Sequence, residues 1–194
     1  NGRKVMAAAA ETLTPVVLEL GGKDPMIICD DAVLEQAVST ALFGVFNACG
    51  QMCVGVERLY VFSAIYDAFV AQVTERARAL RQGPPLTGDG EVDLGAMTMP
   101  RQLEIIQSLV DDAVAKGARL LLGGRPRADL GANFYPPTIL VDVDHSMRIT
   151  REEQFGPVMV IMRVDSEDEA IARANDCPYG LGSSVFTRDR RRAE

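Results

Sequence analysis

The feature of this sequence that most constrains its fold is the alternation of short apolar segments with longer helix-forming segments. Runs typical of strands lie at residues 16–20, 25–29, 58–62, 119–122, 138–143, 158–164 and 182–187. Helix-forming segments lie at residues 3–12, 30–46, 63–83, 100–117 and 166–175, and another begins at Asp189. Strands joined through helices pair in parallel, and parallel sheets are covered on both faces. The pattern therefore predicts an α/β fold, a three-layer α/β/α domain with a mostly parallel sheet.

Both ends of the chain are expected to be incomplete elements. No N-terminal cap precedes the helix-forming residues 3–12, and the helix predicted from Asp189 is cut short after a few residues. Inside the chain, Asp30 and Asp31 are expected to cap one helix, and Ser63 is expected to cap the next.

Composition excludes several classes of partner. The chain has 194 residues, of which 47% are hydrophobic, enough for one domain with a sizeable core. Its net charge of −7 leaves no basic face for phosphates, so we expect no nucleic-acid partner. No run approaches the roughly 20 apolar residues of a membrane-spanning helix, and no signal-peptide core follows the first residues. We therefore expect no membrane association and a cytoplasmic protein.

The cysteines indicate reduced thiols. Cys29, Cys49, Cys53 and Cys177 show no repeated CxxC spacing, so neither a disulfide framework nor a zinc knuckle is indicated. Cys49 and Cys53 at helical spacing would still need two more metal ligands, from the other cysteines, a carboxylate or the only histidine, His145. We predict no metal site.

A lone carboxylate, Glu19, interrupts the apolar segment 16–20 just before Gly21 and Gly22. A carboxylate buried at such a place has a raised pKa, which suits it to take a proton from water near neutral pH. Position alone favours a plainer alternative, in which Glu19 faces solvent at a strand end or pairs with Lys23.

A second motif, residues 46–58, places Cys53 in a tight loop between a helix and a strand. Gly50 and Gly55 let the backbone approach closely, so the amide of Cys53 can point at the oxygen of a carbonyl under attack by its own sulfur. Cys49, near the helix end, is expected in the core. The alternative for Cys53 is a small buried apolar residue, the commonest fate of a free cysteine. Ligands of parallel sheets usually bind at the carboxyl ends of the strands, where we expect both motifs.

Together, residues 18–25 and 46–58 resemble the glutamate and cysteine signatures of the aldehyde dehydrogenase superfamily, in the family's order and separation. Residues 152–158 look like its E-x-F-G-P-V segment, and residues 175–187 resemble its Asn...Tyr-Gly-Leu...Val-Phe-Thr region. The resemblance covers the whole chain. One departure is Ala48, which stands where the family often has asparagine, and we expect it to affect packing and not chemistry.

The resemblance implies a role for five residues. Cys53 would be the nucleophile, and Glu19 would activate the water that hydrolyses the acyl-enzyme. Glu153 would bind the ribose next to the nicotinamide, Phe155 would pack beside the nicotinamide ring, and Gly21 would lie beside the cofactor. Without the resemblance, Glu153 would be interpreted as a solvated turn residue and Phe155 as a core aromatic.

The implied function is oxidation of an aldehyde substrate to a carboxylic acid, with NAD or NADP as cofactor, through a cysteine thiohemiacetal and a thioester. Residues 1–14 would end the cofactor-binding domain, and residues 15–194 would form a C-terminally truncated catalytic domain without the oligomerisation hairpin. The full-length protein would be a homo-oligomer.

Three alternatives stay open. One is an acylating relative that passes the acyl group to coenzyme A. Another is a non-catalytic fragment that lacks the dinucleotide-binding domain. The third is a protease-like Cys–His pair, for which His145 is the only histidine available.

Overall fold

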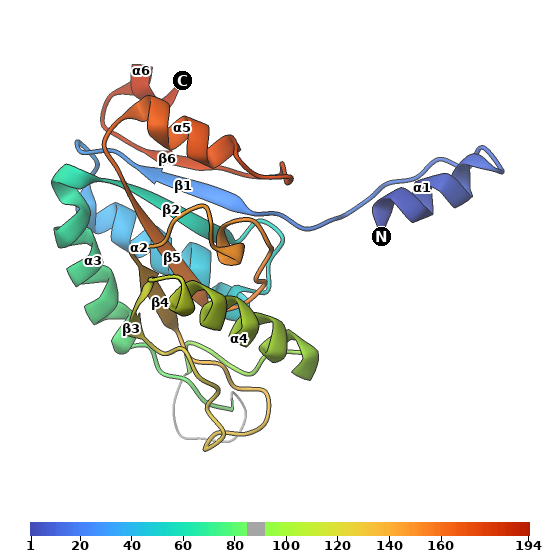
Figure 1. Ribbon diagram of the computed structural model, residues 1–194, viewed down its shortest axis with the longest axis horizontal. Helices are drawn as coiled ribbons and strands as arrows, with labels where there is room; N and C mark the ends of the chain where they lie inside the picture. Colours follow the sequence, from blue (N-terminus) through green and yellow to red (C-terminus); the bar gives the residue numbers. More distant parts are fainter. Residues whose placement is uncertain (85–91) are drawn as a thin grey trace.

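The computed structural model of the chain describes residues 1–84 and 92–194 (Figure 1). Six strands in these residues form one sheet, in the order β3-β4-β5-β2-β1-β6. They are β1 (Asp24–Ile28), β2 (Val56–Phe62), β3 (Arg119–Leu122), β4 (Thr138–Val141), β5 (Val158–Val164) and β6 (Ser184–Phe186). All neighbouring strands pair in parallel except β3 and β4, which are antiparallel. The predicted mostly parallel sheet is confirmed.

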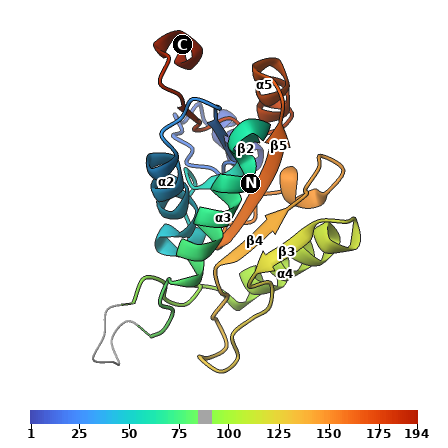
Figure 2. The same ribbon diagram turned by 90° about the vertical axis from the view of Figure 1, so that its left-hand side faces the viewer.

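Helices cover both faces of this sheet. The helices of the described residues are α1 (Gly2–Ala10), α2 (Leu34–Phe46), α3 (Ser63–Arg78), α4 (Pro100–Ala115), α5 (Glu167–Asn175) and α6 (Arg190–Ala193), with short 3-10 turns η1 (Asn47–Gly50) and η2 (Arg148–Thr150). Figure 2 shows α2 and α3 on one face and α4 and α5 on the other, so the three-layer arrangement is confirmed. No helix of the described residues is long and apolar enough to cross a membrane.

The core is built on the central strands β2 and β5. Residues 59–61 of β2 and 158–162 of β5 are completely buried, because helices cover both sides of these strands. Leu59 pairs with Ile161 and Phe62 with Val164 in register. The uninterrupted apolar runs in the sequence reflect this burial on two faces.

Neither of the two predicted helix caps forms, whereas Ser166 and Asp189, where the sequence predicted helices to begin, do cap their helices. Ser166 accepts a hydrogen bond from the Glu169 amide at the start of α5. The caps predicted at Asp30 and Asp31 are wrong, because α2 begins at Leu34 with Val33 at its N-cap. Asp31 instead accepts hydrogen bonds from residues 187–189 at the end of β6, which lies next to β1.

The helix predicted to begin at Asp189 is α6, and Asp189 caps it by accepting from the Arg191 amide. Ser63 is the first residue of α3 and not its cap, since its hydroxyl donates to the carbonyl of Val164. That helix ends at Arg78, before the predicted end near residue 83, because Gln82 leaves the helix to bridge with Leu94.

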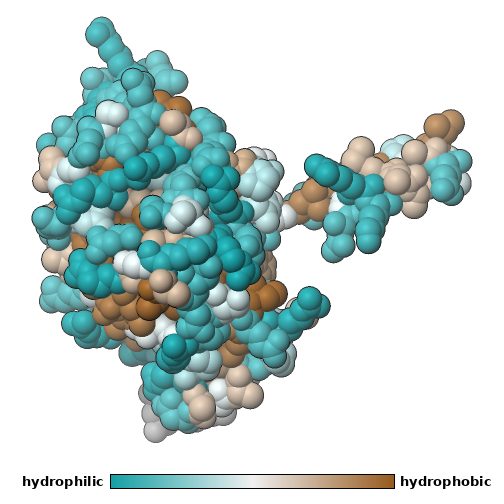
Figure 3. Space-filling view, in the orientation of Figure 1, coloured by the Kyte–Doolittle hydropathy of each residue, from teal (hydrophilic) through white to brown (hydrophobic). Residues whose placement is uncertain are grey.

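The buried strand predicted at residues 16–20 is wrong. This segment forms no strand, and it runs from the sheet toward α1, which lies apart from the body of the molecule (Figures 1 and 3). Leu13 and Val17 are about nine-tenths exposed, at 89% and 91%. Residues 16–20 pair with none of the six strands of the sheet, and without a pairing partner an apolar run does not form a strand.

Candidate active site

The predicted site residues gather at the amino ends of the parallel strands. Gly21 and Gly22 precede β1, Cys53 precedes β2, and residues 153–155 precede β5. Because β1, β2 and β5 are parallel neighbours, their first residues lie along one edge of the sheet. The expectation that the motifs lie at carboxyl ends is therefore wrong. It depended on a strand ending at residue 20, and that strand does not form.

The loop that carries Cys53 begins with a sharp change of direction after α2. Ala48, Cys49 and Gly50 all have positive φ, at 49°, 58° and 70°. A Cβ on Gly50 would lie 2.2 Å from the carbonyl oxygen of Gly156, so only glycine fits this approach. The amide of Gly55 then donates to Met52 at 3.0 Å and closes a turn around Cys53. The predicted tight loop is confirmed.

The cysteines differ in exposure. Cys53 is half-buried in its loop, whereas Cys49 is buried and its Sγ donates to the carbonyl oxygen of Gly95 at 3.4 Å. Burial raises the pKa of the Cys49 thiol, and burial also raises the pKa of Cys29. Cys49 is in the core as predicted. In the second motif, Cys53 is the thiol that a substrate can reach.

The double glycine lies between Cys53 and Glu153. The amide of Gly22 donates to Glu153 Oε1 at 3.1 Å. A Cβ on Gly21 would lie 2.2 Å from Glu153 Oε2, and a Cβ on Gly22 would lie 2.3 Å from the carbonyl oxygen of Cys53. Burial raises the pKa of Glu153, against the hydrogen bond from Gly22, which lowers it. Segments more than 100 residues apart in the sequence thus meet at one point.

Glu19 is not buried beside these residues. Its side chain is exposed on the segment that leads toward α1, so the predicted burial is wrong, and the alternative in which Glu19 faces solvent describes the structure. The other alternative, a pair with Lys23, is also wrong. Lys23 is buried, and its Nζ lies 2.8 Å from Glu57 Oε2.

Sequence reasoning missed a buried network beneath the site. The Lys23 ammonium contacts Gln154 Oε1 as well as Glu57, and burial lowers the pKa of Lys23, opposed by the Glu57 charge. Glu57 Oε1 accepts from the Phe155 amide at 2.9 Å, and Phe155 has a left-handed φ of 43°. The one available signal was the charged pair Glu57 and Arg58 at the start of an apolar strand.

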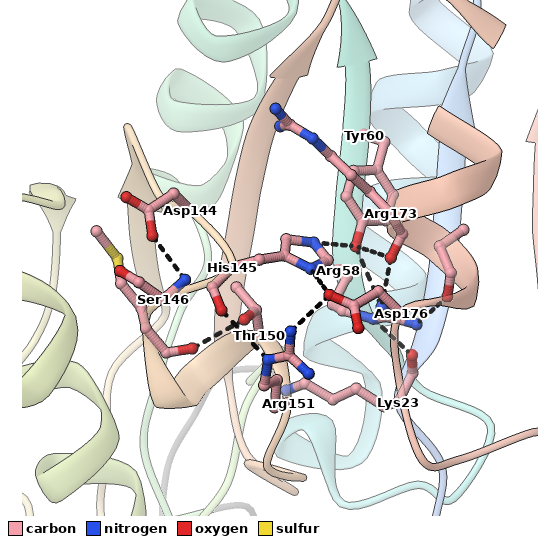
Figure 4. Close-up of polar contacts among 12 residues, drawn as sticks. Lys23, Arg58, Tyr60, Asp144, His145, Ser146, Thr150, Arg151, Arg173 and Asp176 are labelled. Carbon is pink, nitrogen blue, oxygen red and sulfur yellow. Dashed lines mark hydrogen bonds and ion pairs between the residues drawn. The ribbon is translucent and has the colours of Figure 1, made fainter. Parts of the chain in front are cut away.

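Arg58 ties the start of β1 to the end of α5. Its Nε donates to the carbonyl oxygen of Lys23 at 2.9 Å, and its guanidinium also donates to the carbonyl oxygens of Arg173 and Ala174 (Figure 4). The last carbonyls of a helix attract a cation, so this placement stabilises the C-terminus of α5.

His145 is engaged away from Cys53. Its Nε2 lies 3.0 Å from the Tyr60 hydroxyl, and its Nδ1 lies 2.9 Å from Asp176 Oδ2 (Figure 4). Asp176 also pairs with Arg151. Both ring nitrogens therefore have partners, and the alternative of a Cys–His pair is not supported.

A cavity of about 380 Å³ lies between β1, β6 and α5. Its walls include Asp24, Arg58, Tyr179 and Gly182, and Cys53 is not among its lining residues. Cys53 therefore lies outside this cavity. In residues 1–84 and 92–194, no three His, Cys, Asp or Glu side chains are grouped to hold a metal ion.

Comparison with known proteins agrees with the motifs. The model of the aldehyde dehydrogenase family matches residues 1–194. The chain is 45% identical over 193 residues to a betaine aldehyde dehydrogenase of Cereibacter sphaeroides, which covers 100% of this chain and 39% of that protein. The chain therefore spans about two fifths of the length of the curated relatives it matches.

Solved structures give the same result. The crystal structure of lactaldehyde dehydrogenase from Escherichia coli superposes with a TM-score of 0.94 and 42% identity, over 99% of this chain and 40% of that chain. Betaine aldehyde dehydrogenase from Staphylococcus aureus, in complex with NAD+, gives a TM-score of 0.91 and 37% identity over 99% of this chain and 38% of that chain.

Proposed function

The chain belongs to the aldehyde dehydrogenase family, and on that basis we propose that it forms the catalytic part of an enzyme that oxidises an aldehyde to a carboxylic acid. NAD or NADP is the hydride acceptor, in line with the NAD+ bound by the Staphylococcus aureus relative. The observation that carries the proposal is the meeting of Gly22, Cys53 and Glu153 at one edge of the sheet.

Cys53 is the nucleophile. Its thiolate forms a bond to the aldehyde carbon, and the carbonyl oxygen becomes the oxygen of a thiohemiacetal, with the Cys53 amide as a candidate donor to it. A bound NAD(P)+ would supply the hydride acceptor, and loss of a hydride from this carbon leaves a thioester on Cys53. Water then adds to the thioester, the S–C bond breaks, and the sulfur is free again.

The half-buried carboxylate of Glu153 suits the ribose of a dinucleotide. Only one of its oxygens accepts from Gly22, so the carboxylate keeps acceptor sites for sugar hydroxyls. Phe155, two residues later, offers a half-buried aromatic ring for the nicotinamide. Gly21 has no side chain to compete for the space beside Glu153.

Glu19 is the base that activates the hydrolytic water. Its exposed position requires the segment of residues 11–20 to lie over Cys53 in the working enzyme. Support comes from the chain itself, because Gly22, three residues later, already packs against the Cys53 carbonyl. We also propose that residues 1–14 end a cofactor-binding domain and that residues 15–194 form the catalytic domain. The boundary between the two falls within this exposed segment. We keep the cytoplasmic location and the homo-oligomeric assembly as predictions.

The test is Glu19→Gln in the complete protein. We expect Cys53 to acylate and to release one equivalent of reduced cofactor, while steady-state acid formation falls by about 10²–10⁴-fold because no base activates the water. Glu11→Gln, on the same exposed segment, is the matched control and should change nothing. Undiminished steady-state acid formation in Glu19→Gln would refute the role.

The same assay separates the alternatives. If Glu19→Gln changes steady-state turnover little and coenzyme A accelerates turnover of the unmodified protein, then the acylating alternative holds. If the complete protein yields no reduced cofactor even in the first turnover, then the non-catalytic alternative holds.

A further inference from the structure

Glu57 is the centre of the buried network beneath the candidate site. It is only 5% exposed, although it carries a carboxylate. Its Oε1 accepts from the Phe155 amide at 2.9 Å, and its Oε2 accepts from the Gln154 amide at 3.2 Å and from Lys23 Nζ at 2.8 Å. A buried carboxylate satisfied by two backbone amides and one ammonium holds all three donors in place.

We propose that Glu57 is a positioning residue for the cofactor-binding segment, because it fixes the backbone that places Glu153 and Phe155 relative to Gly21 and Cys53. The inference rests on the proposed function, in which Glu153 and Phe155 contact the dinucleotide. Glu57 itself touches neither substrate nor cofactor. It acts through the two residues on either side of Gln154.

The anchoring of Gln154 explains how this works. Gln154 is completely buried, its Nε2 donates to the carbonyl oxygen of Val158 at 2.9 Å, and its own carbonyl accepts from Gln102 at 2.7 Å. The residues before and after it, Glu153 and Phe155, are only half-buried. The segment is therefore fastened through its middle residue, and its two flanking side chains remain available to a ligand.

The backbone conformation of Phe155 depends on these hydrogen bonds to Glu57 and Gln154. Its φ of 43° lies in the left-handed region, which a residue with a bulky side chain adopts only when its surroundings impose it. The Phe155 amide is held by Glu57 at 2.9 Å. Loss of that acceptor should let the backbone relax toward negative φ and turn the aromatic ring away.

Lys23 links the same carboxylate to the other side of the site. It follows Gly21 and Gly22 directly, and its side chain is fully buried against Glu57. One carboxylate thus fixes the segment that contacts Cys53 and the segment that carries Glu153. Their mutual placement, seen in the 3.1 Å bond from Gly22 to Glu153, depends on both attachments.

The test uses Glu57→Gln in the complete protein, with hydrogen exchange and enzyme kinetics. The amides of Gln154 and Phe155 should exchange at least about tenfold faster, because a carboxamide has one acceptor oxygen and no charge. The KM for the dinucleotide should rise by about tenfold. Acylation of Cys53 by an activated ester, which needs no cofactor, should keep its rate.

A second variant protects the test against simple unfolding. Glu57→Gln leaves the Lys23 ammonium buried without its counter-charge, so Lys23→Met with Glu57→Gln removes both charges of this pair together. We expect the double variant to fold and to keep the fast exchange and the raised KM. Tyr66→Phe, which removes the hydroxyl of a buried tyrosine in α3 beside Asp142 and Arg163, is the matched control and should change neither.

Two outcomes would overturn the inference. Exchange and KM that return to their original values in the double variant would mean that Glu57 only neutralises Lys23. An unchanged KM in Glu57→Gln, when Glu153→Ala raises it, would mean that Glu57 does not position the segment. If Glu153→Ala also leaves the KM unchanged, the cofactor role in the proposed function fails instead.

Discussion

Replacement of Gly22 by alanine should misplace Cys53, the proposed nucleophile. A Cβ at this position would lie 2.3 Å from the carbonyl oxygen of Cys53 and 2.8 Å from Asp24 Oδ1. Cβ atoms do not approach such atoms within 3.0 Å, so the gap to Cys53 must widen by at least about 0.7 Å. The atom in the way is backbone, and it cannot rotate aside as a side chain can. The loop that carries Cys53, or the start of β1, must therefore move.

The size of this displacement sets the expected loss. A misplacement of about 1 Å at a reacting group costs about 10²-fold in rate, so Cys53 acylation should fall by about 10- to 100-fold in Gly22→Ala. Overpacking should lower the free energy of unfolding by about 1–3 kcal/mol, which a domain of this size tolerates.

The assay is the rate at which an activated ester acylates Cys53, measured beside chemical unfolding. Gly180→Ala is the matched control, because a Cβ there meets nothing within 4 Å. That change should leave acylation alone and raise the free energy of unfolding by about 0.4–1 kcal/mol. If Gly22→Ala folds and acylates at the original rate, then the contact of Gly22 with Cys53 does not position the thiol, and our reasoning fails.

Cys53 should react with a thiol reagent at neutral pH before Cys49 does, because burial shields Cys49 and raises the pKa of its thiol; equal labelling of the native protein would contradict this. Gly21→Ala should raise the KM for the dinucleotide with less than about 0.5 kcal/mol of change in stability, since the three atoms nearest to its Cβ all belong to the flexible carboxylate of Glu153; an unaltered KM would disagree. Glu153→Gln should gain stability relative to the original protein as pH rises from about 4 to about 7. The pKa of Glu153 is raised by burial, so its contribution to stability is fully present below the unfolded pKa and is lost as pH rises through the folded one. Urea unfolding at the two pH values measures this, and a constant difference would argue against it.

The sequence predicted most of the sheet because its strands are buried on both faces. Residues 59–62 and 158–162 are continuous apolar runs, and the structure places them in β2 and β5 at the centre. Residues 16–20 have similar composition and form no strand. Composition reports whether a segment suits a strand, whereas a strand exists only where a neighbour pairs with it. Whether a neighbouring strand is available depends on the tertiary structure and cannot be inferred from the segment alone.

The site, too, could be predicted only in part, because its residues come together through tertiary contacts. Motifs located Cys53 and Glu153, but not the edge of the sheet where they meet, and not Lys23 against Glu57. That contact joins residues 34 apart in the sequence, and it follows from the register in which Asp24 pairs with Val56. No local pattern encodes the register of two parallel strands joined through a helix.

Two consecutive residues at the start of β2, Glu57 and Arg58, contact different parts of the site. They can do so because successive side chains of a strand point to opposite faces of the sheet. Glu57 holds the backbone of residues 154–155 and the Lys23 ammonium, while Arg58, the next residue, holds the Lys23 carbonyl and the end of α5. The side chain of Lys23 is therefore bound by Glu57, and its main-chain carbonyl is bound by Arg58, the next residue. Cys53 lies only a few residues before Glu57 and Arg58, on the loop that leads into β2. The placement of residues 153–155 thus depends on two buried charges that do no chemistry themselves, and substitutions at these charges should alter cofactor binding before they alter the reactivity of the Cys53 thiol.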